Sequence, residues 1–317
     1  MIKVLVTGAG GFIGNHLVTR LKKEGFWVRG ADLKFPEFSD SDADDFKLLD
    51  LRHSENCMIA CDGIDWVFNL AADMGGIGYI TKYLAYIFRN NALINLHMIE
   101  AARRNRVKKY LFSSSACIYP KYLQKSEDVT PLKESDAFPA DAEDGYGWEK
   151  LFTELICTYY QIDYKFNKHI ARFHNIFGPL GAYQGGQEKA PAALCRKVAL
   201  ATEGDTIEIW GDGLQTRSFC YVDDCVDGLL TLINSDYHEP LNIGQDRLIS
   251  INDLFDMTCE IAGKKLNKIH NLSKPQGVRG RNSDNSLTKQ ILKWEPKVSL
   301  EDGMKLTYDW INAEVHK

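Results

Sequence analysis

The sequence lacks an apolar run long enough to cross a bilayer. The longest run, around Val226 to Ile233, is short and interrupted, whereas a membrane helix needs about 20 apolar residues. The N-terminal residues also lack the basic start and the small-residue cleavage site of a signal peptide. We therefore expect a cytoplasmic protein with no membrane partner.

Paired cysteine motifs are missing as well. The eight cysteines are scattered, and none has the C-x-x-C spacing of zinc sites or redox dithiols, so we predict reduced cysteines and no metal. Positive charge is not in surplus, since 38 Lys and Arg residues stand against 43 Asp and Glu residues, a net charge of −5. This balance argues against broad electrostatic binding to nucleic acid.

The first half of the chain alternates short apolar strands with amphipathic helices. Strands are predicted over Lys3–Thr7, Trp27–Ala31, Asp65–Asn69 and Lys109–Ser113, and helices over Gly14–Glu24 and Asn91–Asn105. This alternation predicts the α/β class, with a Rossmann-type, doubly wound parallel sheet that has helices on both faces. The acidic stretch Asp40–Asp45 is interpreted as a solvated loop.

After about Asn175 the alternation becomes less regular. Loops are predicted over Phe177–Gly186 and Gly211–Arg217, and further sheet-domain elements over Phe219–Val222, Cys225–Asn234 and Leu241–Ile243. We expect residues 1–175 plus 219–245 to form a dinucleotide-binding domain. Residues 176–218 plus 246–317 are expected to form a smaller C-terminal lobe. A ligand should bind between them, beyond the carboxyl ends of the strands.

A glycine-rich turn follows the first predicted strand and opens a helix. Its sequence is Thr7-Gly8-Ala9-Gly10-Gly11-Phe12-Ile13-Gly14. Gly8 permits the tight turn, Gly11 lets the backbone approach a pyrophosphate, and Gly14 allows close packing of helix on sheet. Phe12 and Ile13 begin the helix, whose N-terminal N–H groups and dipole favour phosphate. We interpret the turn as a dinucleotide site.

Two carboxylates bear on the choice of dinucleotide. Asp32 follows Gly14 by 18 residues at the end of the second predicted strand. A carboxylate there accepts the ribose hydroxyls of NAD and repels the 2′-phosphate of NADP, although the nearby Lys34 weakens that preference. Asp50 either faces the adenine or caps a strand. The sequence therefore favours NAD.

Tyr146 and Lys150 lie four residues apart, a spacing that places both on one face of a helix. A nearby ammonium stabilises tyrosinate and lowers the pKa of the phenol toward a range suited to general-base work. Ser115, the last residue of a serine run after a predicted strand, can position a substrate hydroxyl. The order of glycine turn, serine run and Tyr–Lys helix favours catalysis over a chance surface pair.

In this order the motifs resemble those of the extended short-chain dehydrogenases/reductases, over nearly the whole chain. Further matching segments are Ala71-Ala72, Asn91, Arg172-Phe173-His174-Asn175 and Gly211 to Phe219. The resemblance implies NAD in the first domain, with Ala71 and Asn175 among its contacts beside Tyr146 and Lys150, and a nucleotide sugar in the smaller lobe. Ser218 departs from the pattern, because many members carry an aspartate there.

Four longer strings resemble the branch of this family that epimerises GDP-mannose at C3 and C5. They are Ala71 to Gly76, Ser115 to Pro120, Gln187 to Ala193 and Val278 to Asn285. The resemblance implies that Cys117 and Lys189 are an epimerising acid/base pair. By residue type alone, a cysteine is more often a small buried hydrophobe and a lysine a solvated charge. A thiol with a pKa of about 8.5 is nevertheless a suitable proton carrier.

The same resemblance implies a reaction and a substrate cradle. Tyr146, with Lys150 and Ser115, would remove the C4 hydroxyl proton during oxidation by NAD; Cys117 and Lys189 would exchange protons beside the 4-ketone before C4 is reduced again. GDP-mannose would give GDP-L-galactose and GDP-L-gulose. The implied contacts to the GDP-hexose are Gly75, Gly76, Ser115, Ala116, Cys117, Tyr146, Asn175, Glu188, Lys189, Ala190, Pro191, Lys197, Gln215, Thr216, Arg217 and Arg281.

Several alternatives stay open. A 4-epimerase has no need of Cys117, and a 4,6-dehydratase would carry an acid in its place. A related epimerase or dehydratase could act on a modified GDP- or UDP-hexose, or at one carbon only. A non-catalytic NAD sensor on the same fold would not require Tyr146 and Lys150. Dimers are common in the family, and we expect a homodimer that uses the helix near Gly147.

Overall fold

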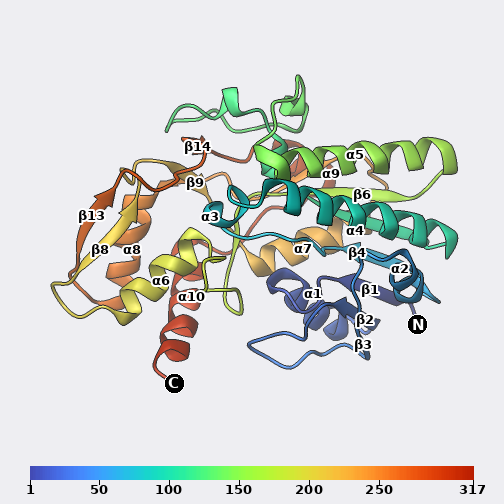
Figure 1. Ribbon diagram of the computed structural model, residues 1–317, viewed down its shortest axis with the longest axis horizontal. Coiled ribbons are helices and arrows are strands. Elements are labelled where there is room, and N and C mark those ends of the chain that lie inside the picture. Colours follow the sequence, from blue (N-terminus) through green and yellow to red (C-terminus); the bar gives the residue numbers. More distant parts are fainter.

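The computed structural model describes residues 1–317 and contains a central sheet of seven parallel strands (Figure 1). The strand order is β3-β2-β1-β4-β5-β6-β11. This is the order of a doubly wound dinucleotide-binding sheet, so the predicted fold class is confirmed. The strands are β1 (Lys3–Thr7), β2 (Trp27–Asp32), β3 (Asp45–Leu48), β4 (Trp66–Asn69), β5 (Lys109–Ser115), β6 (Lys168–Phe173) and β11 (Leu241–Ile243).

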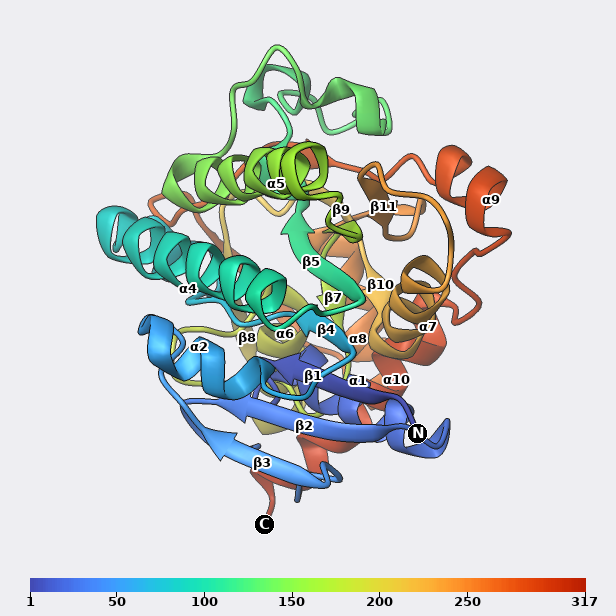
Figure 2. The same ribbon diagram turned by 90° about the vertical axis from the view of Figure 1, so that its right-hand side faces the viewer.

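Helices cover both faces of this sheet, as the crossovers between parallel strands require. Figure 2 shows α2, α4 and α5 on one face and α1 and α7 on the other. Their bounds are α1 (Phe12–Lys23), α2 (Ser54–Cys61), α4 (Leu84–Arg104), α5 (Asp144–Tyr164) and α7 (Val222–Ile233). Successive residues of β1 enter different cores, since Val4 and Val6 pack with one cluster and Leu5 with the other.

A smaller group of elements packs beyond the carboxyl ends of the strands, on the left in Figure 1. Its helices are α6 (Ala190–Leu200), α8 (Ile251–Ala262) and α10 (Leu300–Val315), while α9 (Ser286–Leu292) lies against β11. Its strands are β8 (Thr206–Trp210) with β13 (Asn267–Asn271), and β12 (Leu248–Ser250), β9 (Thr216–Ser218) and β14 (Gly280–Arg281). None of the helices has both the length and the apolar character needed to span a membrane.

Short helical turns connect the main elements near the strand ends. They are α3 (Ile77–Ile80) and the 3-10 turns Ala116–Ile118, Lys121–Leu123 and Glu134–Ala137. The last three belong to the long connection between β5 and α5. The two-residue strands β7 (Ile176–Phe177) and β10 (Cys220–Tyr221) pair with each other in parallel.

Two predicted elements differ from the observed ones. The helix predicted from Asn91 begins at Leu84. Its first turns carry exposed apolar side chains, such as Leu84 and Phe88, so the helical spacing of core-facing residues is not visible there in the sequence. The segment predicted over Phe219–Val222 contains the strand β10, which pairs with β7 in a separate sheet because β11 occupies the place beside β6 in the central sheet.

The last residues of two predicted loops belong to strands in the structure. Asp45 begins β3, a half-exposed edge strand whose mixed residues carry little apolar signal. Thr216 and Arg217 begin β9, which is held by pairing with β12 and β14. Neither strand has the apolar alternation on which the prediction depended.

Candidate active site

A cavity of about 1150 Å³ lies at the carboxyl ends of the central strands. It is lined by the glycine turn, the ends of β2, β4 and β5, the first residues of α5 and α6, and parts of the smaller lobe. Of the predicted site residues, Thr216 alone is absent from its lining. The Thr216 hydroxyl instead donates a hydrogen bond to the carbonyl of Glu127.

The glycine turn has the shape of a phosphate cradle. Gly8 has a φ of +70°, and a Cβ on Gly14 would lie 2.0 Å from the Gly8 carbonyl oxygen. Gly10 is required for a different reason, because its Cβ would lie 2.0 Å from the carbonyl oxygen of Lys34. A Cβ on Gly11 would meet only the Gly8 oxygen, at 3.2 Å, so this residue borders open space. The N-terminus of α1 therefore faces the cavity directly.

Asp32 ends β2 and lines the same part of the cavity. It accepts hydrogen bonds from the backbone N–H groups of Gly10, at 2.9 Å, and Leu33, at 2.6 Å. Burial raises the pKa of the carboxyl, and these N–H groups oppose that rise. The ammonium of Lys34 pairs with Glu37 at 3.1 Å. These contacts hold Asp32 in place with acceptor capacity left for a ligand.

Asp50 also lines the cavity but is paired within the protein. Its carboxylate forms an ion pair with Arg52 at 2.6 Å. Hydrogen bonds from Arg52 lower the pKa of Asp50 to about 2. Asp50 is thus ionised and turned toward a guanidinium that lines the same cavity.

Tyr146 and Lys150 lie in the first part of α5, and both side chains are buried. The ammonium of Lys150 donates to the Ser113 carbonyl at 2.9 Å and lies 5.6 Å from the centre of the Tyr146 ring. Burial raises the pKa of Tyr146, against a smaller opposing effect of the Ser115 hydroxyl. The charges of Cys117 and Glu149 raise this pKa further, so the lowering of the Tyr146 pKa that the sequence predicted for Lys150 is not found.

The end of β5 and the start of α5 place Cys117 beside Tyr146. The Ser115 hydroxyl accepts the backbone N–H of Cys117 at 3.2 Å. The Cys117 carbonyl accepts the N–H of Glu143 at 2.9 Å. A Cβ on Gly147 would lie only 2.2 Å from that carbonyl oxygen. The glycine after Tyr146 thus allows α5 to contact the backbone that carries the cysteine.

The thiol of Cys117 meets a buried guanidinium. Arg281 Nη1 lies 3.5 Å from the Cys117 Sγ, Nε donates to Gln124 Oε1 at 2.7 Å, and Nη2 donates to Glu143 Oε2 at 2.6 Å. Burial raises the pKa of the Cys117 thiol, and the charge of Arg281 opposes this rise. Arg281 lines the cavity with its guanidinium already bound to protein atoms.

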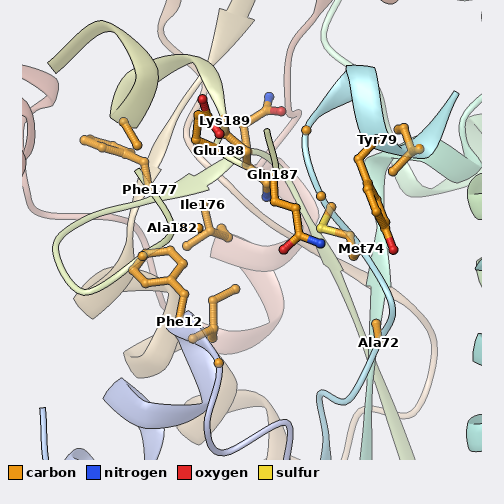
Figure 3. A pocket seen from close by; sticks show the side chains of 18 of the residues that line it. Phe12, Ala72, Met74, Tyr79, Ile176, Phe177, Ala182, Gln187, Glu188 and Lys189 are labelled. Carbon is orange, nitrogen blue, oxygen red and sulfur yellow. The ribbon is translucent and has the colours of Figure 1, made fainter. Parts of the chain in front are cut away.

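Lys189 approaches the cavity from the N-terminus of α6 (Figure 3). Its side chain is half-buried, and burial lowers the pKa of its ammonium while the charge of Cys117 raises it. The two groups therefore act on one another across the same cavity. Pro191, in the first turn of α6, needs no N–H partner and suits this position.

Gly75 and Gly76 let two protein segments touch. The N–H of Gly76 donates to the Gln187 carbonyl at 3.0 Å. A Cβ there would lie 2.5 Å from the carbonyl oxygen of Glu188, and the Gly75 Cβ would lie 3.0 Å from the Tyr79 side chain. Gly76 thus joins the segment after β4 to the segment before α6, and Gly75 leaves room for the Tyr79 side chain.

The remaining predicted residues line the part of the cavity nearer the smaller lobe. Gln215 is buried, donates to the Trp210 carbonyl at 3.0 Å and has an Oε1 with no hydrogen-bond partner. Arg217 donates to the carbonyls of Thr216 and Gln276. Lys197 donates to the carbonyl of Glu208 at 2.6 Å.

Asn175 lies where β6 leaves the central sheet. It has a φ of +45°, and its amide donates to the Ser218 carbonyl at 2.9 Å. Ala71, Ala116 and Ala190 contribute small side chains to the cavity wall. With them, every predicted contact apart from Thr216 borders one continuous space.

Sequence reasoning missed Glu143, Gln124 and Gly147. Glu143 and Gln124 contact Arg281, which lies 138 and 157 residues away along the chain, so no local pattern pairs them. Gly147 does carry a local signal, since a glycine within a helix is unfavourable unless it serves close packing. That signal could have indicated a contact between α5 and the cysteine segment.

A doubly wound sheet, a glycine turn beside a carboxylate, and a buried Tyr–Lys pair together define a dinucleotide-dependent enzyme of the short-chain dehydrogenase/reductase type. More particularly, the chain belongs to the NAD dependent epimerase/dehydratase family, whose model matches residues 4–244.

Two curated relatives are similar over the whole chain. GDP-mannose 3,5-epimerase of Arabidopsis thaliana is 50% identical over 318 residues, which cover 100% of this chain and 84% of the relative. GDP-mannose 3,5-epimerase 1 of Oryza sativa subsp. japonica is 48% identical and covers 100% of this chain and 83% of the relative.

Solved structures share the fold at lower identity. UDP-glucose 4-epimerase of Thermotoga maritima, crystallised with UDP-glucose, matches with a TM-score of 0.88 at 27% identity and covers 99% of this chain and 100% of that one. UDP-glucuronic acid 4-epimerase of Bacillus cereus, in complex with UDP-glucuronic acid and NAD, matches with a TM-score of 0.85 at 26% identity. The match covers 99% of this chain and 100% of that one.

Proposed function

We propose that this chain is a GDP-mannose 3,5-epimerase, which converts GDP-mannose to GDP-L-galactose and GDP-L-gulose. One observation carries the proposal: a single cavity is lined by two pairs of residues whose side chains can transfer protons, Tyr146 with Lys150 and Cys117 with Lys189. A 4-epimerase needs only the first pair. The identity of 50% and 48% to relatives of that name supports GDP-mannose as the substrate.

The residues around the glycine turn fit NAD, because the open Gly11 backbone suits a pyrophosphate and Asp32 suits a ribose. When bound, NAD supplies the hydride acceptor for oxidation at C4 and the hydride donor for the final reduction. The residues that would hold it are Gly8, Gly11, Phe12, Ile13, Gly14, Asp32, Asp50, Ala71, Tyr146, Lys150 and Asn175.

The chain's own residues then move protons at three carbons of the sugar. Tyr146, oriented by Lys150 and Ser115, takes the proton of the C4 hydroxyl and returns it after epimerisation. The 4-ketone makes the C–H bonds at C3 and C5 acidic, since each carbanion is stabilised as an enolate. Cys117 and Lys189 remove these protons and deliver protons to the opposite face. No atom or electron is gained or lost overall.

Burial suits Cys117 and Lys189 to this exchange. It raises the pKa of the thiol and lowers the pKa of the ammonium. Burial therefore moves the pKa values of the two groups, about 8.5 and 10.4 when exposed, in opposite directions and favours the neutral form of each. Such a pair can donate a proton from one residue and accept one at the other.

The rest of the cavity is proposed to hold the GDP-hexose. The sugar would lie against Gly75, Gly76, Ser115, Ala116, Asn175, Glu188, Ala190 and Pro191, and the nucleotide against Lys197, Gln215, Arg217 and Arg281. The unpartnered Oε1 of Gln215 supports a hydrogen-bond donor on the ligand. Thr216 is not part of this proposal, because it does not line the cavity and its hydroxyl binds the Glu127 carbonyl.

A homodimer is also part of the proposal. Five of the exposed apolar side chains on α5, with exposed fractions between 37% and 57%, follow a regular spacing: Trp148, Phe152, Leu155, Tyr159 and Ile162. Their spacing of four and three residues forms one stripe along the helix, as in helices that pair with a second helix. A second copy of the chain can cover this stripe by twofold symmetry.

Two broader assignments belong to the same proposal. Residues 1–175 plus 219–245 would bind NAD, and residues 176–218 plus 246–317 would bind the nucleotide sugar. A cytoplasmic location is supported by the eight cysteines, all of which are unpaired and buried.

Incubation with GDP-mannose in D2O, followed by NMR of the sugar, tests the proposed reaction. Deuterium at C3 and C5, with galactose-like and gulose-like products and no lasting NADH, is the expected result. Deuterium at one carbon only would indicate a single-site epimerase. No exchange by folded, NAD-loaded protein would contradict the proposed substrate, and modified GDP- and UDP-hexoses would then be tested. A non-catalytic sensor would bind NAD but would incorporate deuterium into none of these sugars.

A further inference from the structure

Glu143 is a buried carboxylate that takes no part in the proton transfers of the proposed reaction. It precedes the first residue of α5, and its side chain forms the ion pair with Arg281. It lines the reaction cavity and also a second, smaller cavity of about 460 Å³. The carboxylate therefore lies in the wall between the two spaces.

Arg281 connects this carboxylate to the reactive thiol. Its Nη2 donates to Glu143 while its Nη1 lies against the Sγ of Cys117, and Gln124 holds the Nε. The three contacts fix the plane of the guanidinium, so that it cannot turn from the thiol without losing its other partners.

The charged and titratable groups that act on Cys117 are mostly cations. They are Arg281, Arg217, Lys189 and Lys150, together with Tyr146 and Glu143. Glu143 is the single carboxylate among them. If Glu143 carried no negative charge, the Arg281 guanidinium would have no counter-ion and would stabilise a thiolate at Cys117 more strongly.

An acid/base residue must both lose and regain its proton in each turnover, which an over-stabilised thiolate cannot do efficiently. We propose that Glu143 is a positioning residue for epimerisation: it holds Arg281 against the Sγ of Cys117 and offsets the guanidinium charge, so that the thiol can release and recover a proton. This inference rests on the proposed function, in which Cys117 transfers protons to and from the sugar.

The test is the pH dependence of Cys117 alkylation in the full-length, NAD-loaded protein. Iodoacetamide is the probe, and mass spectrometry of the Cys117 peptide reads the reaction at this residue. Cys117 is the one cysteine among the eight that lines the reaction cavity. The variant Glu143→Gln keeps the shape and a hydrogen-bond acceptor but removes the charge. Its alkylation midpoint should fall by about one pH unit, because thiolate becomes easier to form.

Two further variants separate charge from shape. Glu143→Asp keeps the charge, so its midpoint should stay closer to that of the parent protein. Glu127→Gln is the matched control, because Glu127 pairs with Arg279, two residues from Arg281, yet is exposed and does not contact Cys117. This variant should leave the midpoint unchanged. If Glu143→Gln does not fold, Arg281→Gln should move the midpoint upward, since the cation is lost.

The pH profile of deuterium exchange at C3 and C5 should shift in Glu143→Gln by the same amount as the alkylation midpoint. An unchanged midpoint in the folded variant, or an equal shift in Glu127→Gln, would overturn the role of Glu143. Failure of the parent protein to exchange deuterium would instead contradict the proposed function. The thiol titration needs no substrate, so the two failures are distinguishable.

Discussion

At the scale of the residue, the proton chemistry of the site depends on how burial acts on oppositely charged groups. Cys117 and Lys189 border one cavity, where desolvation disfavours both thiolate and ammonium. Arg281 supplies a charge that limits this effect at the thiol. Burial thus favours a neutral thiol beside a neutral amine.

Removal of either member of this pair should stop epimerisation and spare oxidation. In Cys117→Ala and Lys189→Ala we expect deuterium incorporation at C3 and C5 to fall by about 10²- to 10⁴-fold, the usual contribution of a general acid or base. Tyr146 and Lys150 remain, so GDP-mannose should still produce NADH absorbance on the enzyme. NMR and absorbance measure the two steps. Undiminished exchange in both variants would disprove the pairing.

The same pair predicts a bell-shaped pH dependence of kcat/KM. Because the pKa of Lys189 is lowered, its amine is neutral down to a lower pH than that of an exposed lysine. Because the pKa of Cys117 is raised, its thiol keeps the proton up to a higher pH. The rate should therefore fall below the first pKa and above the second, roughly tenfold per pH unit. A profile that is flat or has only one limb contradicts this assignment.

At the scale of the element, the contact between α5 and the end of β5 sets the distance between the two proposed proton-transfer pairs. Tyr146 and Lys150 lie on α5, whereas Ser115 and Cys117 follow β5. Gly147 permits the contact, because any larger residue would meet the Cys117 carbonyl. A helix glycine normally weakens its helix, so this one serves packing.

Gly147→Ala should therefore reduce both stability and activity. A Cβ placed 2.2 Å from the Cys117 carbonyl oxygen forces α5 and this segment apart. The expected loss in the free energy of unfolding is about 1–3 kcal/mol, measured by urea denaturation. Gly78→Ala is the control for stability, since its nearest neighbours are at 3.6 Å. Equal stability of the two variants would contradict the close contact.

At the scale of the whole molecule, the active site is a space between two groups of elements. The central sheet contributes the glycine turn and the residues after β5, and the smaller lobe contributes α6 and the strands around Gln215. The contact of Gly76 with Gln187 and Glu188 joins the two sides. Changes in either group of elements can therefore alter the same cavity.

The exposed stripe on α5 predicts the assembly of the molecule. A lysine in place of Phe152 would put a charge in the centre of a twofold interface, so Phe152→Lys should shift the protein from dimer to monomer. Sedimentation velocity measures the change. Leu306→Lys, at an apolar side chain that is 50% exposed on α10, is the control and should stay dimeric. A monomeric parent protein would contradict the proposed interface.

Much of the fold was predictable because the sequence patterns that indicate strands, helices and turns extend over short stretches of the chain. Period-two and helical patterns located β1, β2, β4, β5 and the first helix, and the strand–turn–helix context identified the glycine turn. The start of α4, the edge strand β3 and the strand β9 were missed or misplaced. Their residues are exposed or paired with distant strands, so the apolar pattern that marks a core-facing element is weak there.

The sequence by itself determined the α/β class, the cofactor turn and the residue types that can carry protons, because backbone stereochemistry and side-chain chemistry depend on short stretches of chain. Only the tertiary structure decided that Arg281 meets Cys117, although 164 residues separate them, and that the same guanidinium also binds Glu143. It also directed Thr216 toward Glu127 and away from the cavity. Such contacts arise from the packing of the lobe against the sheet, which no local pattern encodes.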